Sequence, residues 1–408
     1  MTIEPAGNQQ LLKDIHRMML VRQLCSRPGL SRADLANAVG LTKSTVSLLV
    51  RDLIDEGWLV EREVVATGEL GRRPTPLFIE PRRLLLLGIE VGIESVRVVV
   101  TSLTGDVLAR TESGFGLAKR MSAKACIGML ASTLFKVSKQ LSKSEHRVIG
   151  IGMGLPGGVD EARGFLHSGP HLGWGDVPMG TLLAESLAGS ALANVPLYMQ
   201  NEADVAALGE MEFSTLQHTD SLLYLSINQG VGAGVIVGDR LLTGRCGFAG
   251  EVGHMVLQLN GPLCSCGRHG CAEALIGPRA LLRTEGEHAH SMAEAKRLVA
   301  EQDAESLRAA KKAGSYLGVL LNNLASAYDP GCIVVGGAMV ELGDVFLQPA
   351  MRTLNELSAA ANLRPPKVRT SRFGTDAVAV GAAALVRYRL TRPLISITPN
   401  NSAIKEAA

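Results

Sequence analysis

No stretch of this chain is apolar over enough residues to cross a membrane. A membrane-spanning helix needs about 18 apolar residues, and the run LLLLGIEVG is already interrupted by Glu90. The N-terminal MTIEPAGNQQ is polar with no apolar segment behind it, so a secretory signal is not expected either. We therefore expect a soluble, cytoplasmic protein that has no membrane partner and keeps its thiols reduced.

The chain also lacks a strong excess of charge of either sign. Its net charge is +2 over 408 residues, so overall charge does not by itself indicate nucleic acid or a membrane surface as a partner. Aromatic residues make up only 4%, whereas 45 glycines allow many tight turns and close backbone approaches. A hydrophobic fraction of 46% is enough to fill the cores of two or three domains.

Residues 1–80 are predicted to form three helices followed by a hairpin. A Pro-Gly pair ends an amphipathic helix, Ser31 caps a second helix, and Gly40 ends that helix before Thr42 caps a third. Two short helices joined by a tight glycine-containing turn are typical of a helix-turn-helix. The β-rich runs that begin at Trp58 flank a Gly/Arg/Pro tip, which is typical of a wing. This order predicts a winged helix-turn-helix domain.

The third of these helices has the composition of a DNA-recognition helix. Its first turn carries hydroxyl donors and a cation that can reach phosphates and base edges, and the arginines of the hairpin tip are placed to enter a minor groove. The candidate DNA contacts are Ser31, Thr42, Lys43, Ser44, Thr45, Ser47, Arg51, Arg72 and Arg73. A helical hairpin with solvated charges is the alternative. The succession of three helices and an Arg-tipped hairpin favours DNA binding.

After Pro81 the pattern changes to strands linked by glycine-containing turns. The runs LLLLGIEVG, SVRVVVTSL and GDVLARTES predict three strands, and a helix is predicted over residues 122–141. Residues 221–244, SLLYLSINQGVGAGVIVGDRLLTG, repeat the order of apolar strand, glycine-rich turn, apolar strand and Gly-Asp turn. Two similar lobes of strands and helices are expected to enclose a cleft, where ligands usually bind.

Six further segments follow one another along this body. They are VIGIGMGLPGGVD (148–160), HLGW (171–174), QNEADVAALGE (200–210), AGEVGHM (249–255), CSCGRHGCAE (264–273) and NNLASAYDPGCIVVGGAM (322–339). In this order they resemble the ROK family, which comprises sugar-responsive repressors and sugar kinases. The resemblance covers about residues 84–390. A winged-helix head in front is similar to the repressor branch, with its xylose, glucose and N-acetylglucosamine repressors.

The resemblance implies an α/β fold in which the winged helix-turn-helix domain precedes a two-lobed, actin-like ATPase (ribonuclease H-like) body. We expect the DNA-binding domain over residues 1–80, the first lobe over 84–200 and the second lobe with its cysteine loop over 201–390. Residues 391–408 are expected to form a frayed tail.

Three of the seven cysteines lie in CSCGRHGCAE, where they could be disulfide partners, redox thiols, a nucleophile or metal ligands. Disulfides are disfavoured by the expected compartment and the odd number of cysteines, and a redox pair is more typical of C-x-x-C than of C-x-C. Three thiolates and an imidazole suit a closed, structural Zn²⁺ site. The spacing H-x9-C-x-C-x4-C, which also matches the family's zinc motif, gives the ligands His254, Cys264, Cys266 and Cys271.

Two carboxylates, Glu251 and Glu273, flank the cysteine loop. A metal loop holds both in fixed positions, and carboxylates accept hydrogen bonds from sugar hydroxyls. The alternative is that they only support the metal site. The resemblance implies a sugar site between the lobes that consists of Gly157, Asn201, Glu202, Glu251, His254 and Glu273.

The segments that handle phosphate in the family's kinases differ in this chain. Those kinases have an Asp base where this chain has Glu202, and a carboxylate displaced by about 1 Å lowers a rate about a hundredfold. Their D-x-G-G-T-K loop corresponds to EVGIES, in which Ile93 blocks close backbone approach and Glu94 repels a triphosphate. Their G-T-G corresponds to NQG at 228–230. The chain is therefore predicted not to be an enzyme.

These patterns predict a sugar-responsive transcriptional regulator, and a repressor in particular. It is expected to bind a palindromic operator DNA as a homodimer or homotetramer. A monosaccharide of the xylose, glucose or N-acetylated hexosamine class is expected to change operator affinity. Two alternatives stay open. One is an ATP-dependent hexokinase with a DNA-binding head, and the other is a regulator whose body docks a protein partner and binds no free sugar.

Overall fold

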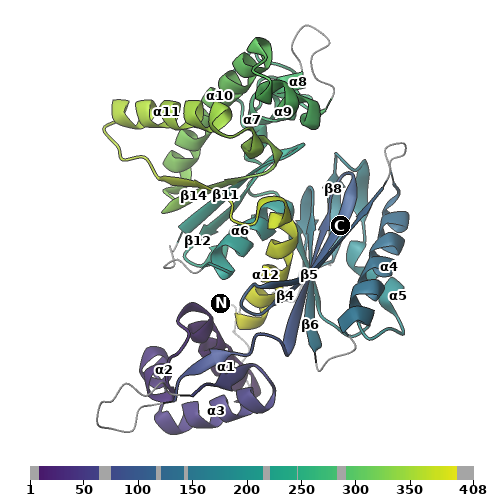
Figure 1. Cartoon of the computed structure of the whole chain (residues 1–408), viewed down its shortest axis with the longest axis vertical. Coiled ribbons are helices and arrows are strands. Elements are labelled where there is room, and N and C mark those ends of the chain that lie inside the picture. The colour runs from purple at the N-terminus through teal and green to yellow at the C-terminus, as the bar shows by residue number, and fades with distance from the viewer. Residues whose placement is uncertain are drawn as a thin grey trace, which may run out of the picture.

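The N-terminal domain, which we call the head, consists of three helices and a two-stranded hairpin (Figure 1). The structure, a computed structural model, describes residues 9–63, 75–115, 121–141, 146–214, 221–245, 247–282 and 291–392. The elements of the head are α1 (Gln9–Ser26), α2 (Arg32–Val39), α3 (Lys43–Asp55), β1 (Leu59–Glu61) and β2 (Leu77–Ile79). β1 and β2 pair antiparallel. The predicted hairpin tip, with Arg72 and Arg73, lies outside the described residues.

Side-chain caps determine where the second and third helices begin. Ser31 Oγ accepts a hydrogen bond from the Asp34 backbone N–H, and the Ser31 backbone N–H donates to the Asp34 carboxylate, which together form a capping box. Thr42 Oγ1 accepts from the Thr45 backbone N–H at the start of α3. Gly40, with a left-handed φ of 71°, ends α2 between them. Both predicted helix starts are therefore confirmed.

The first lobe is built on a five-stranded sheet in the order β10-β6-β3-β4-β5. Its strands are β3 (Leu84–Val91), β4 (Ser95–Ser102), β5 (Val107–Gly114), β6 (Arg147–Leu155) and β10 (Leu197–Asn201). The first three run antiparallel, whereas β6 is parallel to β3 and β10 is parallel to β6. The lobe also contains α4 (Ala123–Leu141), α5 (Met179–Leu187) and a small sheet of β7 (Gly158–Asp160), β8 (Phe165–Gly169) and β9 (Trp174–Val177).

The second lobe repeats this topology in the order β13-β12-β11-β14-β15, which confirms the predicted duplication. Its strands are β11 (Ser221–Ile227), β12 (Val231–Val237), β13 (Arg240–Leu241), β14 (Cys332–Gly336) and β15 (Lys367–Thr370). Its helices are α7 (Ala272–Ile276), α8 (Pro278–Leu282), α9 (Met292–Ala300), α10 (Ala304–Tyr328) and α11 (Asp344–Ala360), and three 3-10 turns are η1 (Val252–His254), η2 (Ala338–Leu342) and η3 (Gly374–Asp376). Within the described ranges, no helix combines the length and apolarity that a membrane crossing requires.

The last helix, α12 (Ala377–Thr391), returns from the second lobe to pack on the first sheet. A Cβ added at Gly152 in β6 would lie 1.8 Å from the Ala382 carbonyl oxygen, so this close contact requires glycine. α12 falls within the range predicted as the second lobe, 201–390, but it packs on the sheet of the first, because helical periodicity does not say which sheet a helix covers. Thr391 and Arg392, within the predicted tail, are buried.

A second helix, α6 (Glu202–Glu212), covers the second sheet and meets α12 between the lobes (Figure 1). A Cβ added at Gly234 in β12 would lie 2.3 Å from the Ala203 carbonyl oxygen. At the crossing of the two helices, a Cβ on Gly209 would lie 3.0 Å from the Cα of Gly381. At this crossing one helix of each lobe therefore approaches the other backbone to backbone.

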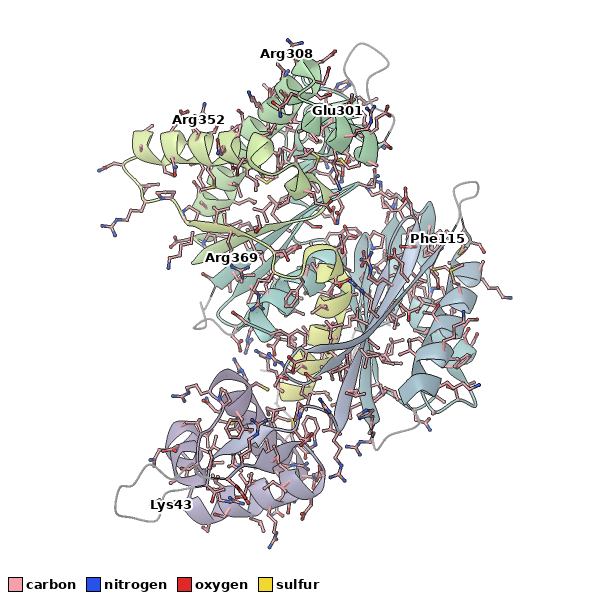
Figure 2. All side chains as sticks on the ribbon, in the orientation of Figure 1. Lys43, Phe115, Glu301, Arg308, Arg352 and Arg369 are labelled. Carbon is pink, nitrogen blue, oxygen red and sulfur yellow. The ribbon has the colours of Figure 1, made fainter. Side chains whose placement is uncertain are left out.

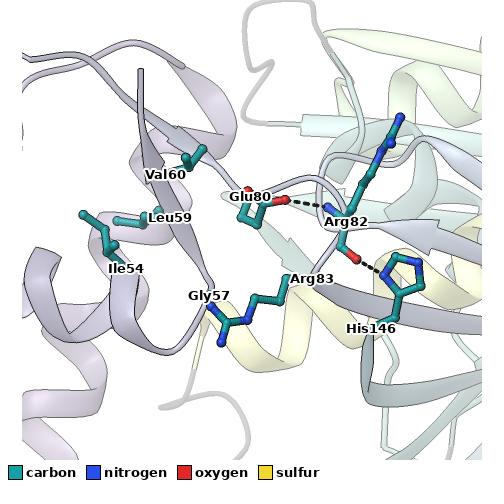
Figure 3. A pocket seen from close by; sticks show the side chains of 8 residues that line it. All are labelled: Ile54, Gly57, Leu59, Val60, Glu80, Arg82, Arg83 and His146. Atoms are coloured by element: carbon teal, nitrogen blue, oxygen red, sulfur yellow. Dashed lines mark hydrogen bonds between the residues drawn. The ribbon is translucent and has the colours of Figure 1, made fainter. Parts of the chain in front are cut away.

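The head meets the body on two sides. On one side the segment that joins them borders a pocket of about 440 Å³ (Figure 3), lined by Ile54, Gly57, Leu59, Val60, Glu80, Arg82, Arg83 and His146. On the other side α1 packs against α12, and Arg22 of α1 forms an ion pair with Asp239 of the second lobe. The head thus contacts elements of both lobes.

Candidate functional site

Four donor atoms of the cysteine loop converge in the second lobe. The ligand atoms of His254, Cys264, Cys266 and Cys271 all lie within 4.8 Å of one another. His254 Nδ1 is 3.6 Å from Cys264 Sγ, and the Sγ atoms of Cys266 and Cys271 are 3.7 Å apart. The structure thus brings the predicted ligands together, and the cluster could hold a metal ion.

Short-range backbone contacts fold the loop around this point. Val256 and Cys271 form an isolated antiparallel bridge, which places His254 beside the end of the loop. Gly270 has a φ of 72°, and a Cβ at this position would lie 1.5 Å from the Gln258 carbonyl oxygen. Any side chain at position 270 would push this segment away from Gln258, so the loop needs glycine here to bring the cluster together.

Glu273 connects the cysteine cluster with the space between the lobes. Its side chain is buried in the first turn of α7. Ser265 Oγ donates a hydrogen bond to Oε1, and Cys264 Sγ lies 3.6 Å from the same oxygen. Its other oxygen, Oε2, is 4.0 Å from His171 Nε2. One carboxylate is therefore shared between the cysteine loop and a residue of the first lobe.

His171 reaches Glu273 from the turn between β8 and β9. A Cβ built on Gly230 of the second lobe would lie 3.0 Å from His171 Nε2, so the absence of a side chain there makes room for the imidazole. Burial lowers the pKa of His171, although Glu273 opposes this, and the imidazole is therefore neutral at pH 7. A neutral imidazole offers one donor and one acceptor to a ligand.

Glu251 lies on the opposite side of His254. Its Oε2 is 3.9 Å from His254 Nε2, so the histidine turns one ring nitrogen to the cysteines and the other to a carboxylate. Burial raises the pKa of Glu251; His254 opposes this shift, and Glu273 adds to it. Glu251, His254 and Glu273 thus form one electrostatically coupled group.

Asn201 and Gly157 form the first-lobe side of the candidate site. Asn201 caps α6: its Oδ1 accepts from the Ala203 N–H at 2.8 Å, and its Nδ2 donates to the Gly157 carbonyl oxygen at 2.9 Å. Gly157 has a φ of 112°, and a Cβ there would lie 1.8 Å from the Ser168 carbonyl oxygen. The two predicted residues are therefore hydrogen-bonded to each other.

Glu202, the first residue of α6, is the most perturbed of the predicted sugar residues. Burial raises its pKa to about 7, and Glu90 and Glu251 add to the rise. Its electrostatic coupling to Glu251 joins the first-lobe residues to the cysteine-loop group. The same helix buries Asp204, whose pKa burial and Glu251 also raise. Burial and neighbouring carboxylates therefore raise the pKa values of both acids at the start of α6.

The structure also describes EVGIES and NQG, the two segments predicted to correspond to the phosphate loops of kinases. At the first, Arg97 Nη1 donates to Glu90 Oε2 at 2.7 Å and also bonds the Thr375 carbonyl oxygen. Arg97 Nε lies 3.6 Å from Asp376. With Glu112 Oε1 at 3.3 Å from Nη2, a guanidinium held by three carboxylates and a carbonyl thus occupies the end of β3.

In the second segment, NQG, Asn228 forms hydrogen bonds to the backbone on both sides. Asn228 Oδ1 accepts from the Ala338 N–H at 2.9 Å, and its backbone N–H donates to the Gly230 carbonyl oxygen at 2.9 Å. The Ala338 N–H follows the paired glycines at the start of η2, where a backbone amide could otherwise bind an anion. In this chain the Ala338 N–H already donates to the Asn228 side chain.

The head presents an exposed polar surface at the start of α3. Lys43, Ser44, Ser47 and Arg51 are exposed, and Figure 2 shows Lys43 on the side of the head turned away from the lobes. Thr42 is exposed and Thr45 half-buried, and their hydroxyls are hydrogen-bonded to each other. Six of the predicted DNA contacts therefore share one surface.

Ser31 does not belong to this surface. It is 4% exposed, and its hydroxyl donates to the Asp34 carboxylate at 2.7 Å. Its oxygen caps α2 and its hydroxyl hydrogen goes to Asp34, so the structure places this side chain apart from the exposed residues of α3.

Sequence reasoning did not assign three residues that the structure places at the candidate site: His171, Gly230 and Ser265. Their segments, HLGW, NQG and CSCGRHGCAE, are visible as motifs. Their contacts with Glu273 or with one another join positions between 8 and 102 residues apart in the chain. Spacing along the sequence does not report such contacts.

Comparisons with known proteins agree with this architecture. The model of the ROK family matches residues 86–389, and a model described as winged helix-turn-helix DNA-binding matches residues 13–60. The xylose repressor of Bacillus subtilis strain 168 is 29% identical over 93% of this chain and 97% of its own length. A glucokinase of Halalkalibacterium halodurans is 28% identical over 74% of this chain and 95% of its own.

A solved structure supports the same fold. The crystal structure of a ROK family transcriptional regulator, described as a homologue of the E. coli MLC protein, superposes with a TM-score of 0.77. It covers 94% of this chain and 98% of the other, at 23% sequence identity. At that identity the likeness shows the fold, including the order of head and body.

Proposed function

The chain belongs to the ROK family, and on this premise we propose that it is a sugar-responsive transcriptional repressor. One observation carries the proposal: the same chain matches both the winged helix-turn-helix model and the ROK family model. The match to a xylose repressor over 93% of the chain supports it, because so long a match includes part of the head. The head is proposed to bind operator DNA, and the body to bind a monosaccharide between its lobes.

We assign zinc to the four-ligand cluster. A Zn–S bond of about 2.3 Å and a Zn–N bond of about 2.0 Å at tetrahedral angles place two sulfurs about 3.8 Å apart and a nitrogen and a sulfur about 3.5 Å apart. The separations of 3.7 Å between Cys266 and Cys271 and 3.6 Å between His254 and Cys264 fit these values. Bound zinc would supply a structural cross-link with no open coordination position. His254 would then keep Nε2 for Glu251 or a sugar hydroxyl.

The sugar site is proposed to combine both lobes. Glu251, His254 and Glu273 come from the second lobe with the cysteine loop, and Gly157 and Asn201 come from the first. His171 joins them as a further candidate, because it lies against Glu273 across the lobes. Carboxylates that are fixed by a metal loop accept hydrogen bonds from hydroxyls in defined directions, which is how a site discriminates between sugar epimers. Glu202 would add a donor or acceptor according to its protonation.

Operator recognition is assigned to the exposed start of α3. Lys43 and Arg51 would contact phosphates, and the hydroxyls of Thr42, Ser44 and Ser47 would contact phosphates or base edges. Arg72 and Arg73 of the hairpin remain proposed minor-groove contacts. A homodimer or homotetramer that presents two heads to a palindromic site would provide the required affinity.

The proposal is tested by operator binding with and without sugar. An operator duplex obtained by in vitro selection is titrated by fluorescence anisotropy in the presence of monosaccharides, beginning with D-xylose. One sugar is expected to weaken operator binding between 5- and 150-fold, as for ordinary allosteric coupling. Glu251→Ala should lose this response while retaining zinc. If no sugar alters operator affinity or melting temperature, the sugar-responsive function is wrong and the protein-docking alternative gains support.

An ATP-dependent sugar kinase is the second candidate, because the glucokinase match covers most of the body. The Arg97–Glu90 pair and the Asn228–Ala338 hydrogen bond support the non-enzyme proposal, since they lie at the segments predicted to correspond to the kinase phosphate loops. The kinase proposal requires ATP-dependent phosphorylation of a sugar that Glu202→Gln abolishes. We expect no such phosphorylation above the background of a protein-free control.

Lys43→Ala is expected to weaken binding to the operator and to other DNA sequences to a similar extent. Lys43 is an exposed cation at the start of α3, so its loss should remove one phosphate contact and reduce the salt slope of the binding constant by about 1. Anisotropy titrations at several salt concentrations measure this slope. Lys311→Ala, an exposed lysine of α10, is the matched control and should leave it unchanged. An unchanged slope in Lys43→Ala would exclude this residue from the DNA interface.

A further inference from the structure

The ion pair between head and body belongs to a larger charge network. Arg22 of α1 pairs with Asp239 in the turn between β12 and β13. Arg392 Nη2 donates to Asp239 Oδ1 at 2.7 Å and lies 2.7 Å from Glu212 Oε1. Arg387 Nε donates to Glu212 Oε2 at 2.8 Å. The network therefore joins the head, the second lobe and the end of α12, which packs on the first lobe.

Burial divides this network into an inner and an outer part. The side chains of Glu212, Arg387 and Arg392 are 5%, 5% and 7% exposed, whereas those of Asp239 and Arg22 are 31% and 39% exposed. A buried, hydrogen-bonded charge pair is costly to break, whereas an exposed pair contributes little stability. The inner part is thus a fixed support, and the outer Arg22–Asp239 pair can form or separate at little cost.

One helix connects this network with the proposed sugar site. α6 begins at Glu202, is capped by Asn201, and ends at Glu212. All of its residues from Ala203 to Glu212 are buried. A helix of 11 residues spans about 16 Å. A displacement of its first turn by a ligand is therefore carried to Glu212 at the other end.

The arrangement of the helices makes the network sensitive to movement between the lobes. α6 packs on the second sheet and α12 on the first, and they meet at Gly209 and Gly381 without intervening side chains. Asp239 moves with the second lobe, whereas Arg392 follows the end of α12 on the first. Closure of the lobes therefore changes the position of Asp239 relative to α12, against which α1 of the head packs.

The other side of the head leaves room for such a movement. The joining segment borders the pocket of about 440 Å³ shown in Figure 3, beside which Arg83 lies against Gly57 of the head. The head is therefore attached to the body at both places, and the pocket provides space for a change in its orientation.

We propose that Asp239 is the positioning residue through which the body sets the orientation of the DNA-binding head, with Arg22 as its partner on the head. This inference rests on the proposed function, that a sugar bound between the lobes changes operator affinity, and adds that the sugar closes the lobes. In the sugar-free protein Asp239 holds α1 in place. When the lobes close, the displaced Asp239 turns or releases the head and lowers operator affinity.

The test uses the full-length, zinc-loaded protein and the variants Arg22→Ala and Asp239→Ala. Arg27→Ala is the matched control, because Arg27 directly follows α1 and its guanidinium donates to the side chain of Gln23 on that helix rather than to the body. Hydrogen–deuterium exchange without sugar is measured first. Arg22→Ala and Asp239→Ala should each raise exchange at least threefold in residues 20–26 and 238–241, and Arg27→Ala should not.

Operator titration with and without sugar is the second measurement. Arg22→Ala should bind sugar with parental affinity by calorimetry, yet its sugar-induced change in operator affinity should fall at least fivefold. Unchanged exchange at both segments in both variants overturns the inference, as does a parental sugar response in both. If the parent itself shows no sugar response, the proposed function fails, while the exchange measurement still decides whether Asp239 positions the head.

Discussion

Replacing Cys271 by Ser is expected to remove the metal and the sugar response in one step. Cys271 is fully buried, pairs with Val256 in the loop and directly precedes the helix that carries Glu273. Without the ion, Glu273 and His254 would lose the cross-link between their segments, and only hydrogen bonds such as that from Ser265 would hold the Glu273 carboxylate in the loop. Substitution of residues that only support metal ligands typically lowers metal affinity or activity 10- to 100-fold. Loss of a ligand itself is expected to act at the upper end of this range. Sugar affinity of Cys271→Ser should therefore fall about 100-fold, as measured by calorimetry.

Two further variants separate the metal from the sugar. His269→Gln changes a histidine of the same loop that bonds the Gly261 carbonyl oxygen and lies outside the cluster, so zinc content and sugar affinity should stay near parental. Glu251→Ala should keep one zinc per chain, measured by mass spectrometry of the native protein, and lose the sugar. Retention of stoichiometric zinc by Cys271→Ser would contradict the assignment of the cluster.

The parts of the fold that could be predicted are those determined by local chemistry. Ser31 and Thr42 mark helix starts because a hydroxyl that accepts from the backbone three residues on can be recognised in four letters. The strands of both lobes are bounded by glycine-containing turns, and their repetition revealed the duplication. The convergence of His254 with the cysteines followed from ligand chemistry and spacing.

The parts that could not be predicted depend on contacts between distant segments. α12 has residues on all sides that suit burial, so its sequence does not say which sheet it covers. His171 and Glu273 meet only because the lobes face each other. Ser31 fits two patterns in the sequence, since Ser31-x-x-Asp34 is the pattern of a capping box and a hydroxyl can also contact DNA. A residue type can suit two roles, and local structure decides between them.

The charge network at the end of α6 was not predicted either, and it carries the largest expected effect on stability. Glu212 as a whole residue is 7% exposed. Its Oε2 accepts a hydrogen bond from Arg387 Nε at 2.8 Å, and its Oε1 lies 2.7 Å from Arg392 Nη2. Glu212→Gln leaves two buried guanidinium groups without their shared carboxylate. Removing one partner of a buried pair costs about 3–5 kcal/mol, because the remaining charge is desolvated and uncompensated. Urea unfolding should show a loss of this size in the free energy of unfolding.

The same carboxylate predicts how stability depends on pH. Burial alone would raise the pKa of Glu212, but Arg387 and Arg392 outweigh it and hold the pKa below its usual value. The stabilisation is therefore complete above the unfolded pKa of about 4.3 and is lost as the pH falls through the lower, folded value. The difference in unfolding free energy between the parent and Glu212→Gln should narrow over this acidic range.

A matched surface pair distinguishes this effect from a general loss of charge. Arg297 and Glu301 form an ion pair on α9 and its C-terminal cap, with both side chains 56% exposed. Glu301→Gln should change the free energy of unfolding by less than about 1 kcal/mol, because water already screens the pair. Equal effects of the two substitutions would mean that Glu212 is solvated in the native protein. Since Asp239 holds Arg392 from the other side, Glu212→Gln should also loosen the attachment of the head, and exchange in residues 20–26 should rise with it.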